Sequence, residues 1–155
     1  MEELADVARR TLADNRYMVL GTVDPSGRPR VSPLWFSLID HRVAYWLSSP
    51  ESHHSRNIVQ RPEVTMVVFD SGADPYNGQA VYLQATAERV PEDELGVACE
   101  EAFRGVDAAL SFDPLTLKGK PFDLFRARIT GAEAHVRGRD LGDGSGSDQR
   151  VPVEL

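Results

Sequence analysis

The segment from residue 28 to residue 39 carries apolar side chains on both faces of a predicted strand. It reads RPRVSPLWFSLI, with Val31, Trp35 and Ile39 on one face and Leu34, Phe36 and Leu38 on the other. A strand at the surface of an antiparallel sheet usually alternates apolar with polar residues, because one of its faces meets water. Both faces of this strand must therefore be covered. The core covers one, and a bound ring system, a helix or a second subunit covers the other.

Turn residues and β-rich runs alternate along the chain, and most connections are short. Residues 17–23 form a first strand, Asp24-Pro25-Ser26-Gly27 is a turn, and residues 28–39 return as a single long strand. Residues 40–42 turn the chain into a third strand at 43–48, which completes a meander.

Further strands are expected at 64–69, 80–90 and 122–136, the last bent near Gly131. Helices are expected at 2–14, from Ser52 through Gln60, and from 91 to about 104, with a loop at 118–121. About six strands and three helices in this order predict a mainly β (α+β) fold. The expected architecture is an antiparallel barrel with helices packed outside it.

Length and composition favour one domain with a tail. A chain of 155 residues can bury a usable core, and residues 1–136 contain all the predicted elements. From Arg137 onward the sequence turns to Gly, Ser, Asp and Arg, so residues 137–155 are expected to form a flexible tail. The single cysteine, Cys99, excludes an intrachain disulfide and is expected to be a small buried hydrophobe.

Charge and targeting features restrict the possible partners. The net charge is -7 and the pI is about 5.0, which argues against a protein that binds nucleic acid through phosphate contacts. The acidic N-terminus is unlike a secretory signal, and no apolar run approaches the ~20 residues of a membrane span. We expect a cytoplasmic protein without a nucleic-acid or membrane partner.

A polar run, Ser52-His53-His54-Ser55-Arg56-Asn57, opens the second predicted helix. Free N–H groups and a partial positive charge make a helix N-terminus suitable for an anion, and Arg56 could add a forked contact to a phosphate. The same residues also suit a solvated helix start with Ser52 as its cap. Adjacent helical residues point roughly 100° apart, so His53 and His54 would chelate a metal poorly and no metal site is expected.

The run Arg30-Val31-Ser32-Pro33 is a candidate for holding a planar ring. Proline within a strand usually marks a sheet edge, and an open edge would leave the backbone groups of Val31 and Ser32 free to bond a flavin pyrimidine ring. Arg30 could add positive charge beside that ring. An ordinary edge strand that uses proline against aggregation is the alternative. Hydroxyls in Leu47-Ser48-Ser49 could bond a ribityl chain or a phosphate, or could cap the helix.

In their order and spacing, these segments resemble the pyridoxamine 5′-phosphate oxidase-like family of split β-barrel flavoproteins. The matching segments are VLGTV at 19–23, GRPRVSPLWF at 27–36, Leu47-Ser48-Ser49, HSRNI at 54–58, RPEVT at 61–65 and QATAERV at 84–90. The likeness covers residues 4–136. It implies a split antiparallel barrel in which residues 30–34 lie along the flavin ring, while residues 46–49 and 52–57 hold the ribityl phosphate. It also implies a homodimer with two symmetric clefts.

Two departures from the family pattern bear on function. The family often has Lys or Arg where this chain has His54, which weakens the charge available to a phosphate and makes it depend on pH. Residues matching the pyridoxal-phosphate-binding Arg and His of the oxidase itself are not evident near the C-terminus. The resemblance therefore does not favour vitamin B6 oxidation.

The sequence thus favours a homodimeric oxidoreductase that moves hydride or electrons between bound FMN and an unidentified small substrate. The deazaflavin F420 is the alternative cofactor, since relatives of similar size use it. Three further classes stay open: a flavin-binding module without turnover, a haem-binding barrel with His53, His54 or His135 as axial ligand, and a barrel without a cofactor. No catalytic acid or base can be named.

Overall fold

A computed structural model describes residues 2–106, 121–141 and 146–155. The expected loop at 118–121 lies outside these residues except for Pro121. The described residues form an eight-stranded antiparallel sheet in the order β2-β1-β5-β6-β7-β4-β3, with β8 beside β7. No helix among them is long and apolar enough to cross a membrane.

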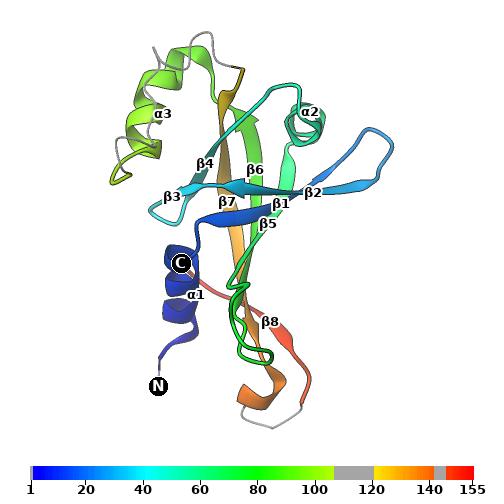
Figure 1. Cartoon of the computed structure of the whole chain (residues 1–155), viewed down its shortest axis with the longest axis vertical. Coiled ribbons are helices and arrows are strands. Elements are labelled where there is room, and N and C mark those ends of the chain that lie inside the picture. Colours follow the sequence, from blue (N-terminus) through cyan, green and yellow to red (C-terminus); the bar gives the residue numbers. More distant parts are fainter. Residues whose placement is uncertain (1, 107–120, 142–145) are drawn as a thin grey trace.

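The predicted elements are present with small changes of boundary. The strands are β1 Tyr17–Val23, β2 Pro29–Trp35, β3 Ser37–Ile39, β4 Val43–Ser48, β5 Glu63–Phe69, β6 Ala80–Arg89, β7 Asp123–Val136 and β8 Gln149–Pro152. The helices are α1 Leu4–Asp14, α2 His53–Gln60 and α3 Leu95–Ala102, with 3₁₀ turns η1 Glu92–Glu94 and η3 Gly138–Asp140. In Figure 1 the long strands β5, β6 and β7 run lengthwise through the molecule, and β1 and β2 cross them. The expectation of a mainly β, split antiparallel barrel with peripheral helices is confirmed.

The single strand expected at 28–39 is wrong, because the chain breaks at Phe36. Its first part, β2, pairs only with β1, and its second part, β3, pairs only with β4. Phe36 is 7% exposed and belongs to the main core, and its N–H donates to the carbonyl of Arg16 at 3.2 Å. Burying this side chain turns the strand, so that β2 and β3 form the two edges of the sheet.

Two apolar clusters hold the fold together. The larger lies inside the sheet and includes Met18, Leu20, Trp46 and Phe125, with α1 packed against it through Ala8 and Leu12. The smaller attaches α3 to β4 and β7 through Tyr45, Val90, Ala98, Cys99, Ala102 and Leu124. Cys99 is buried, as the sequence predicted. Its position in α3 makes it part of this packing.

A bulge bends β7 where the sequence predicted a bend. Gln84 pairs with Gly131 but Ala85 pairs with Ile129, so Thr130 is the extra residue. An added Cβ on Gly131 would come within 2.8 Å of Gln84 Oε1, so the end of the Gln84 side chain would have to move to accommodate it. The bulge lets one long strand pair with β6 along its length, and with β4 and then β8 on its other side.

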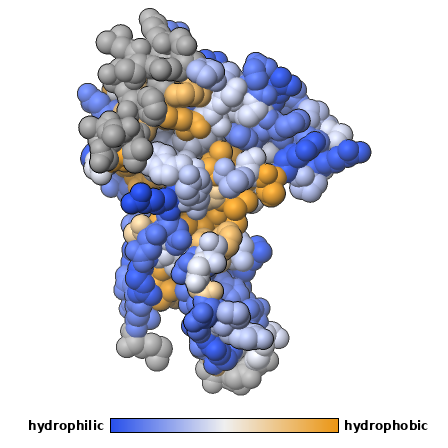
Figure 2. Space-filling model, in the orientation of Figure 1, coloured by the Kyte–Doolittle hydropathy of each residue, from blue (hydrophilic) through white to orange (hydrophobic). Residues whose placement is uncertain are grey.

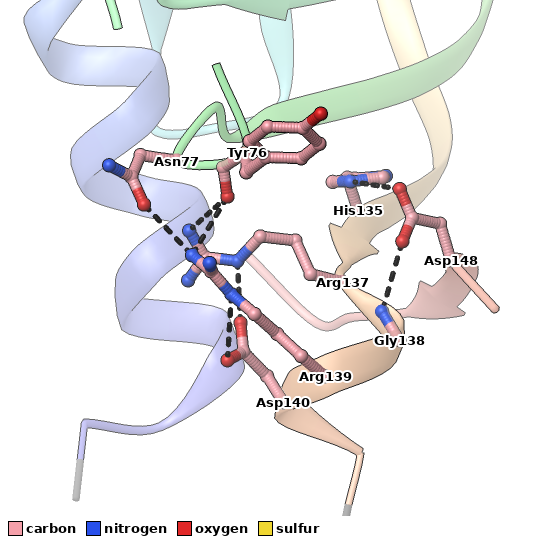
Figure 3. A network of polar contacts seen from close by, with 8 residues as sticks. All are labelled: Tyr76, Asn77, His135, Arg137, Gly138, Arg139, Asp140 and Asp148. Carbon is pink, nitrogen blue, oxygen red and sulfur yellow. Dashed lines mark hydrogen bonds and ion pairs between the residues drawn. The ribbon is translucent and has the colours of Figure 1, made fainter. Parts of the chain in front are cut away.

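The flexible tail expected from residue 137 is a second error. Residues 149–152 form β8, which pairs with residues 133–136 of β7. Figure 3 shows why the preceding residues are held: Arg137 and Arg139 donate to the carbonyl of Tyr76, at 3.3 and 2.8 Å. Arg139 also donates to Asn77 Oδ1 at 2.8 Å, and Arg137 to Asp140 Oδ2 at 2.5 Å.

A second set of contacts in Figure 3 joins β7 to the chain before β8. Asp148 accepts from the backbone N–H of Gly138 at 3.0 Å and pairs with His135 Nε2 at 3.2 Å. A polar composition suggested disorder, but here the charged side chains bind specific backbone and carboxylate oxygens. Residues 142–145 lie outside the described part of the chain.

Candidate functional site

The outer edge of β2 presents one backbone donor between two prolines. The N–H of Asp24 bonds the carbonyl of Arg28 at 2.9 Å, and the N–H of Phe36 bonds that of Arg16. Because backbone groups alternate sides along a strand, even-numbered residues of β2 face β1 and odd-numbered ones face the open edge. Pro29 and Pro33 therefore lie on the open edge with Val31 between them. The sequence had suggested that Ser32 is also free, but its backbone faces β1.

The side chains of β2 divide in the same way. Val31 is 73% exposed and points to the outer face, opposite Gly21. Arg30 and Ser32 point to the side of the barrel interior, because their partners Thr22 and Leu20 are buried. Arg30 Nε lies 3.9 Å from Asp24 Oδ2, so its guanidinium is held near the β1–β2 turn. Hydrogen bonds, first that from the Ser26 hydroxyl, keep the pKa of Asp24 below its usual value.

Hydroxyl groups gather where β4 ends and α2 begins. Ser48 Oγ lies 2.5 Å from His54 Nε2, and Ser52 Oγ lies 3.1 Å from the same nitrogen. Ser52 also donates to the carbonyl of Ser49 at 2.9 Å and accepts from the N–H of Ser55 at 3.4 Å. Ser52 is thus the helix cap that the sequence predicted. We call Ser48, Ser49, Ser52 and His54 the hydroxyl cluster.

Helix α2 turns its predicted site residues to two different sides. His54, Ser55 and Asn57 are buried against the sheet, whereas His53 and Arg56 are exposed. Arg56 Nη2 lies 2.6 Å from Glu51 Oε2, so its charge is paired at the surface and is not in the hydroxyl cluster. Asn57 donates to Thr22 Oγ1 at 3.0 Å, which ties α2 to β1. Thr22 was not predicted from the sequence. Side chains alternate along β1, and this alternation could have indicated that the even-numbered Thr22 faces α2.

Burial favours the neutral form of the His54 imidazole. His54 is 9% exposed, and desolvation, followed by the nearby His53, lowers the pKa of its imidazole from the usual value. A neutral imidazole can accept a hydrogen bond on one nitrogen and donate on the other. At neutral pH the hydroxyl cluster therefore offers hydrogen bonds to an anion without a formal charge.

The two halves of the predicted site lie on strands that are not paired with each other, and we call the region between β2 and the β4–α2 connection the seam. β2 and β4 are not hydrogen-bonded neighbours, yet their Cα atoms approach within 8 Å, and α2 packs against both β1 and β2. The sequence-predicted residues Arg30, Val31, Ser32 and Pro33 lie on one side of this seam. Leu47 and the hydroxyl cluster come from the other side, where β4 runs into α2.

A metal site is not part of this arrangement. Within the ranges 2–106, 121–141 and 146–155, no group of three or more His, Cys, Asp or Glu side chains is placed to hold a metal ion. His54 is hydrogen-bonded to serines, and His135 is paired with Asp148.

A family model described as pyridoxamine 5′-phosphate oxidase matches residues 4–134, which is most of the chain. The chain belongs to this family. The resemblance inferred from the motifs at 19–36 and 47–90 is thereby confirmed. A search of curated proteins finds no match.

Solved structures of several family-like proteins share the fold. A haem-binding protein from Mycobacterium smegmatis superposes with a TM-score of 0.70 at 22% identity, over 98% of this chain but only 59% of its own length. The haem storage protein HutZ from Vibrio cholerae has a TM-score of 0.67 at 21% identity, over 84% of this chain and 94% of its own. An F420 reductase has a TM-score of 0.59 at 25% identity, over 81% of this chain and 94% of its own.

Proposed function

We propose that this protein is an oxidoreductase that binds FMN in the seam between β2 and the β4–α2 connection. One observation supports the proposal: the N–H of Val31 faces an open edge between two prolines, on a strand that approaches β4, and β4 leads into a cluster of hydroxyls at a helix start. A bound flavin would supply hydride or electron transfer to a small organic substrate. The protein's own part would be to orient the ring and exclude competing reactions.

Most of the predicted residues have a role in this proposal. The backbone of Val31 and its neighbour Pro33 would lie along the ring, and Arg30 would provide positive charge at the same end of β2. Ser48, Ser49 and Ser52 would bond the ribityl chain and phosphate. His54 would hydrogen-bond Ser48 and Ser52. Arg56 and His53 would join the site only by turning inward from the outer face of α2, so we expect them to contribute less than the serines.

An apolar face on the outside of the sheet supports a dimeric state for the protein. Tyr17, Val19, Val31 and Val67 occupy one side of β1, β2 and β5, and in Figure 2 apolar residues gather where these strands cross. Exposed apolar patches of this kind mark association surfaces. We propose a homodimer through this face, which would also cover the second side of β2.

F420 and haem are the alternatives that the comparisons support. The F420 reductase shares the fold, and a deazaflavin would use the same open edge. The two haem proteins raise the question of an axial ligand. His54 and His135 are both engaged in side-chain contacts, which leaves His53 on the exposed face of α2 as the more accessible candidate.

An absorption spectrum of freshly purified protein, with mass identification of whatever is released on denaturation, separates these cofactors. We expect a flavin spectrum, or its appearance on adding FMN. A Soret band would instead favour haem, and a colourless protein that ignores FMN, F420 and haemin would overturn the proposal. Reduction of the bound flavin by NAD(P)H and substrate-dependent reoxidation would distinguish an enzyme from a flavin-binding module.

A further inference from the structure

We propose that the hollow between α1 and the β2–β3 junction binds an organic monoanion with an aromatic body, such as an aryl carboxylate. The hollow has a volume of about 530 Å³. Sites for small organic molecules typically measure about 300–1,000 Å³. None of its lining residues belongs to the proposed flavin seam, so this site does not depend on flavin binding.

Aromatic and aliphatic residues make up one part of the wall of the hollow, and polar residues make up the rest. Trp35 and Phe36 lie where the strand breaks, and Leu12 and Leu38 line the hollow from α1 and β3. Trp35 is half-buried, so part of its ring is open to a ligand. Aromatic rings favour offset-stacked or edge-to-face contacts with another ring, worth about 0.5–1.5 kcal/mol beyond area burial. This part of the wall therefore suits a flat apolar body.

Arg16 is placed to supply the charge. It is the one residue with a full formal charge among the described lining residues, and Asp and Glu are absent from that lining. Its side chain makes no ion pair or hydrogen bond with another described residue, while its carbonyl is held by the N–H of Phe36. A planar guanidinium suits a carboxylate, which it can bind through two parallel hydrogen bonds. A monoanion matches this charge, whereas a cation does not.

An unusual turn brings His41 to the same hollow. Asp40 and His41 both have positive φ, 49° and 55°, and the N–H of Arg42 closes the turn on the carbonyl of Ile39 at 2.9 Å. A two-residue hairpin of this type favours Asn-Gly or Asp-Gly, so a histidine at the second position is unfavourable for the backbone. The turn nevertheless places His41 in the lining, where its imidazole could bond a ligand oxygen.

Calorimetric titration of the full-length protein with 2-naphthoate, and with the neutral 2-naphthalenemethanol, tests the site. We expect the acid to bind at least about tenfold more tightly than the alcohol. Arg16→Gln should abolish this preference. Arg10→Gln is the matched control, because Arg10 is an exposed residue of α1 outside this lining and pairs with Glu2.

A second variant keeps the test independent of folding. His41→Gly gives the turn the Asp-Gly pair that it favours, so the midpoint of thermal unfolding should stay the same or rise. The affinity for 2-naphthoate should nevertheless fall several-fold. An acid that binds no better than the alcohol, or binding left intact by both Arg16→Gln and His41→Gly, would overturn the proposal. So would the absence of any binding.

The two tryptophans report where the probe sits. Trp46 is 1% exposed and stacked on Phe125, whereas Trp35 lines the hollow. In an NMR spectrum of the ¹⁵N-labelled protein, the indole signal of Trp35 should shift with 2-naphthoate, and that of Trp46 should not. Trp46→Phe assigns the two signals. Shifts confined to Trp46, or to the amides of β2 residues 30–32, would place the probe elsewhere and contradict the proposal.

Discussion

At the scale of single residues, a substitution that removes the backbone N–H of Val31 tests ligand binding without disturbing the fold. This N–H faces away from β1, so Val31→Pro should remove a donor from the seam without loss of a sheet hydrogen bond. We expect FMN affinity to fall by about 1 kcal/mol, the value of one hydrogen bond, with thermal stability nearly unchanged. Titration of flavin fluorescence measures the first quantity and calorimetry the second.

Ser32→Pro is the matched control for this substitution. The N–H of Ser32 faces β1, so its loss breaks the ladder and should lower the midpoint of thermal unfolding. If Val31→Pro bound FMN as tightly as the unsubstituted protein, the ring would not lie on this edge.

His54 should make the stability of the protein depend on pH. Its pKa is lowered by burial, so the folded protein binds a proton less readily than the unfolded chain, whose imidazole has a pKa of about 6.5. The stability due to neutral His54 is complete above that value and is lost as the pH falls through it. His54→Gln should therefore flatten the decline of unfolding free energy between about pH 7 and about pH 5. Urea denaturation at a series of pH values measures it, and an unchanged slope would contradict the buried neutral imidazole.

The same residue should link phosphate binding to proton uptake. A phosphate beside the hydroxyl cluster would favour the charged imidazole, so FMN should bind more tightly as the pH falls from about 8 to about 6.5. Riboflavin, which lacks the phosphate, should show no such dependence, and His54→Gln should remove it for FMN. Equal pH profiles for FMN and riboflavin would place the phosphate away from His54.

At the scale of elements, signals from neighbouring residues predicted most of the strands. They did not predict features that depend on contacts between residues far apart in the sequence. The turn at residues 24–27 and the cap at Ser52 depend on neighbouring residues, and both are present. The break at Phe36 depends on where its ring is buried, which an alternating pattern does not reveal. His53 and Arg56 lie outside the hydroxyl cluster. Asn57 and Ile58 pack inward, and their packing fixes which side of α2 faces the sheet.

The C-terminal segment is a second case in which contacts between residues far apart in the sequence decide the local structure. Its composition is typical of disorder, but Arg137 and Arg139 find acceptors about sixty residues earlier in the chain, on Tyr76 and Asn77. An added Cβ on Gly138 would overlap the backbone of Gly146 and Ser147. Gly138→Ala should therefore loosen β8 and speed amide exchange there. Gly78→Ala is the control, since nothing lies within 4 Å of its added Cβ; equal exchange in the two variants would contradict this docking.

Arg126 joins β7 to the turn before α3. Its guanidinium is buried and lies 2.6 Å from carboxylate oxygens of both Glu88 and Glu94. Arg126→Met should lower the free energy of unfolding by about 2 kcal/mol, as expected for lost hydrogen bonds between charged groups. Arg89→Gln, which breaks the more exposed pair with Asp123, should cost at most about 1 kcal/mol. Denaturant unfolding that ranked the two variants the other way would contradict this role.

At the scale of the whole molecule, the outer apolar face predicts association. Light scattering during gel filtration should give a mass near twice the 17.1 kDa of one chain. Tyr17→Glu places a charge on this face at an exposed position and should shift the mass toward the monomer. Val97→Glu, on the exposed side of α3, should leave it unchanged. A monomer at all concentrations, with or without FMN, would contradict the proposed dimer.

Whether FMN binds in the seam can be measured by an amide NMR titration of the ¹⁵N-labelled protein with FMN. We expect the signals of Val31 and of residues 52–55 at the start of α2 to shift together and to saturate at one concentration of FMN. Saturable binding that leaves Val31 unmoved, or no binding at all, would contradict this expectation.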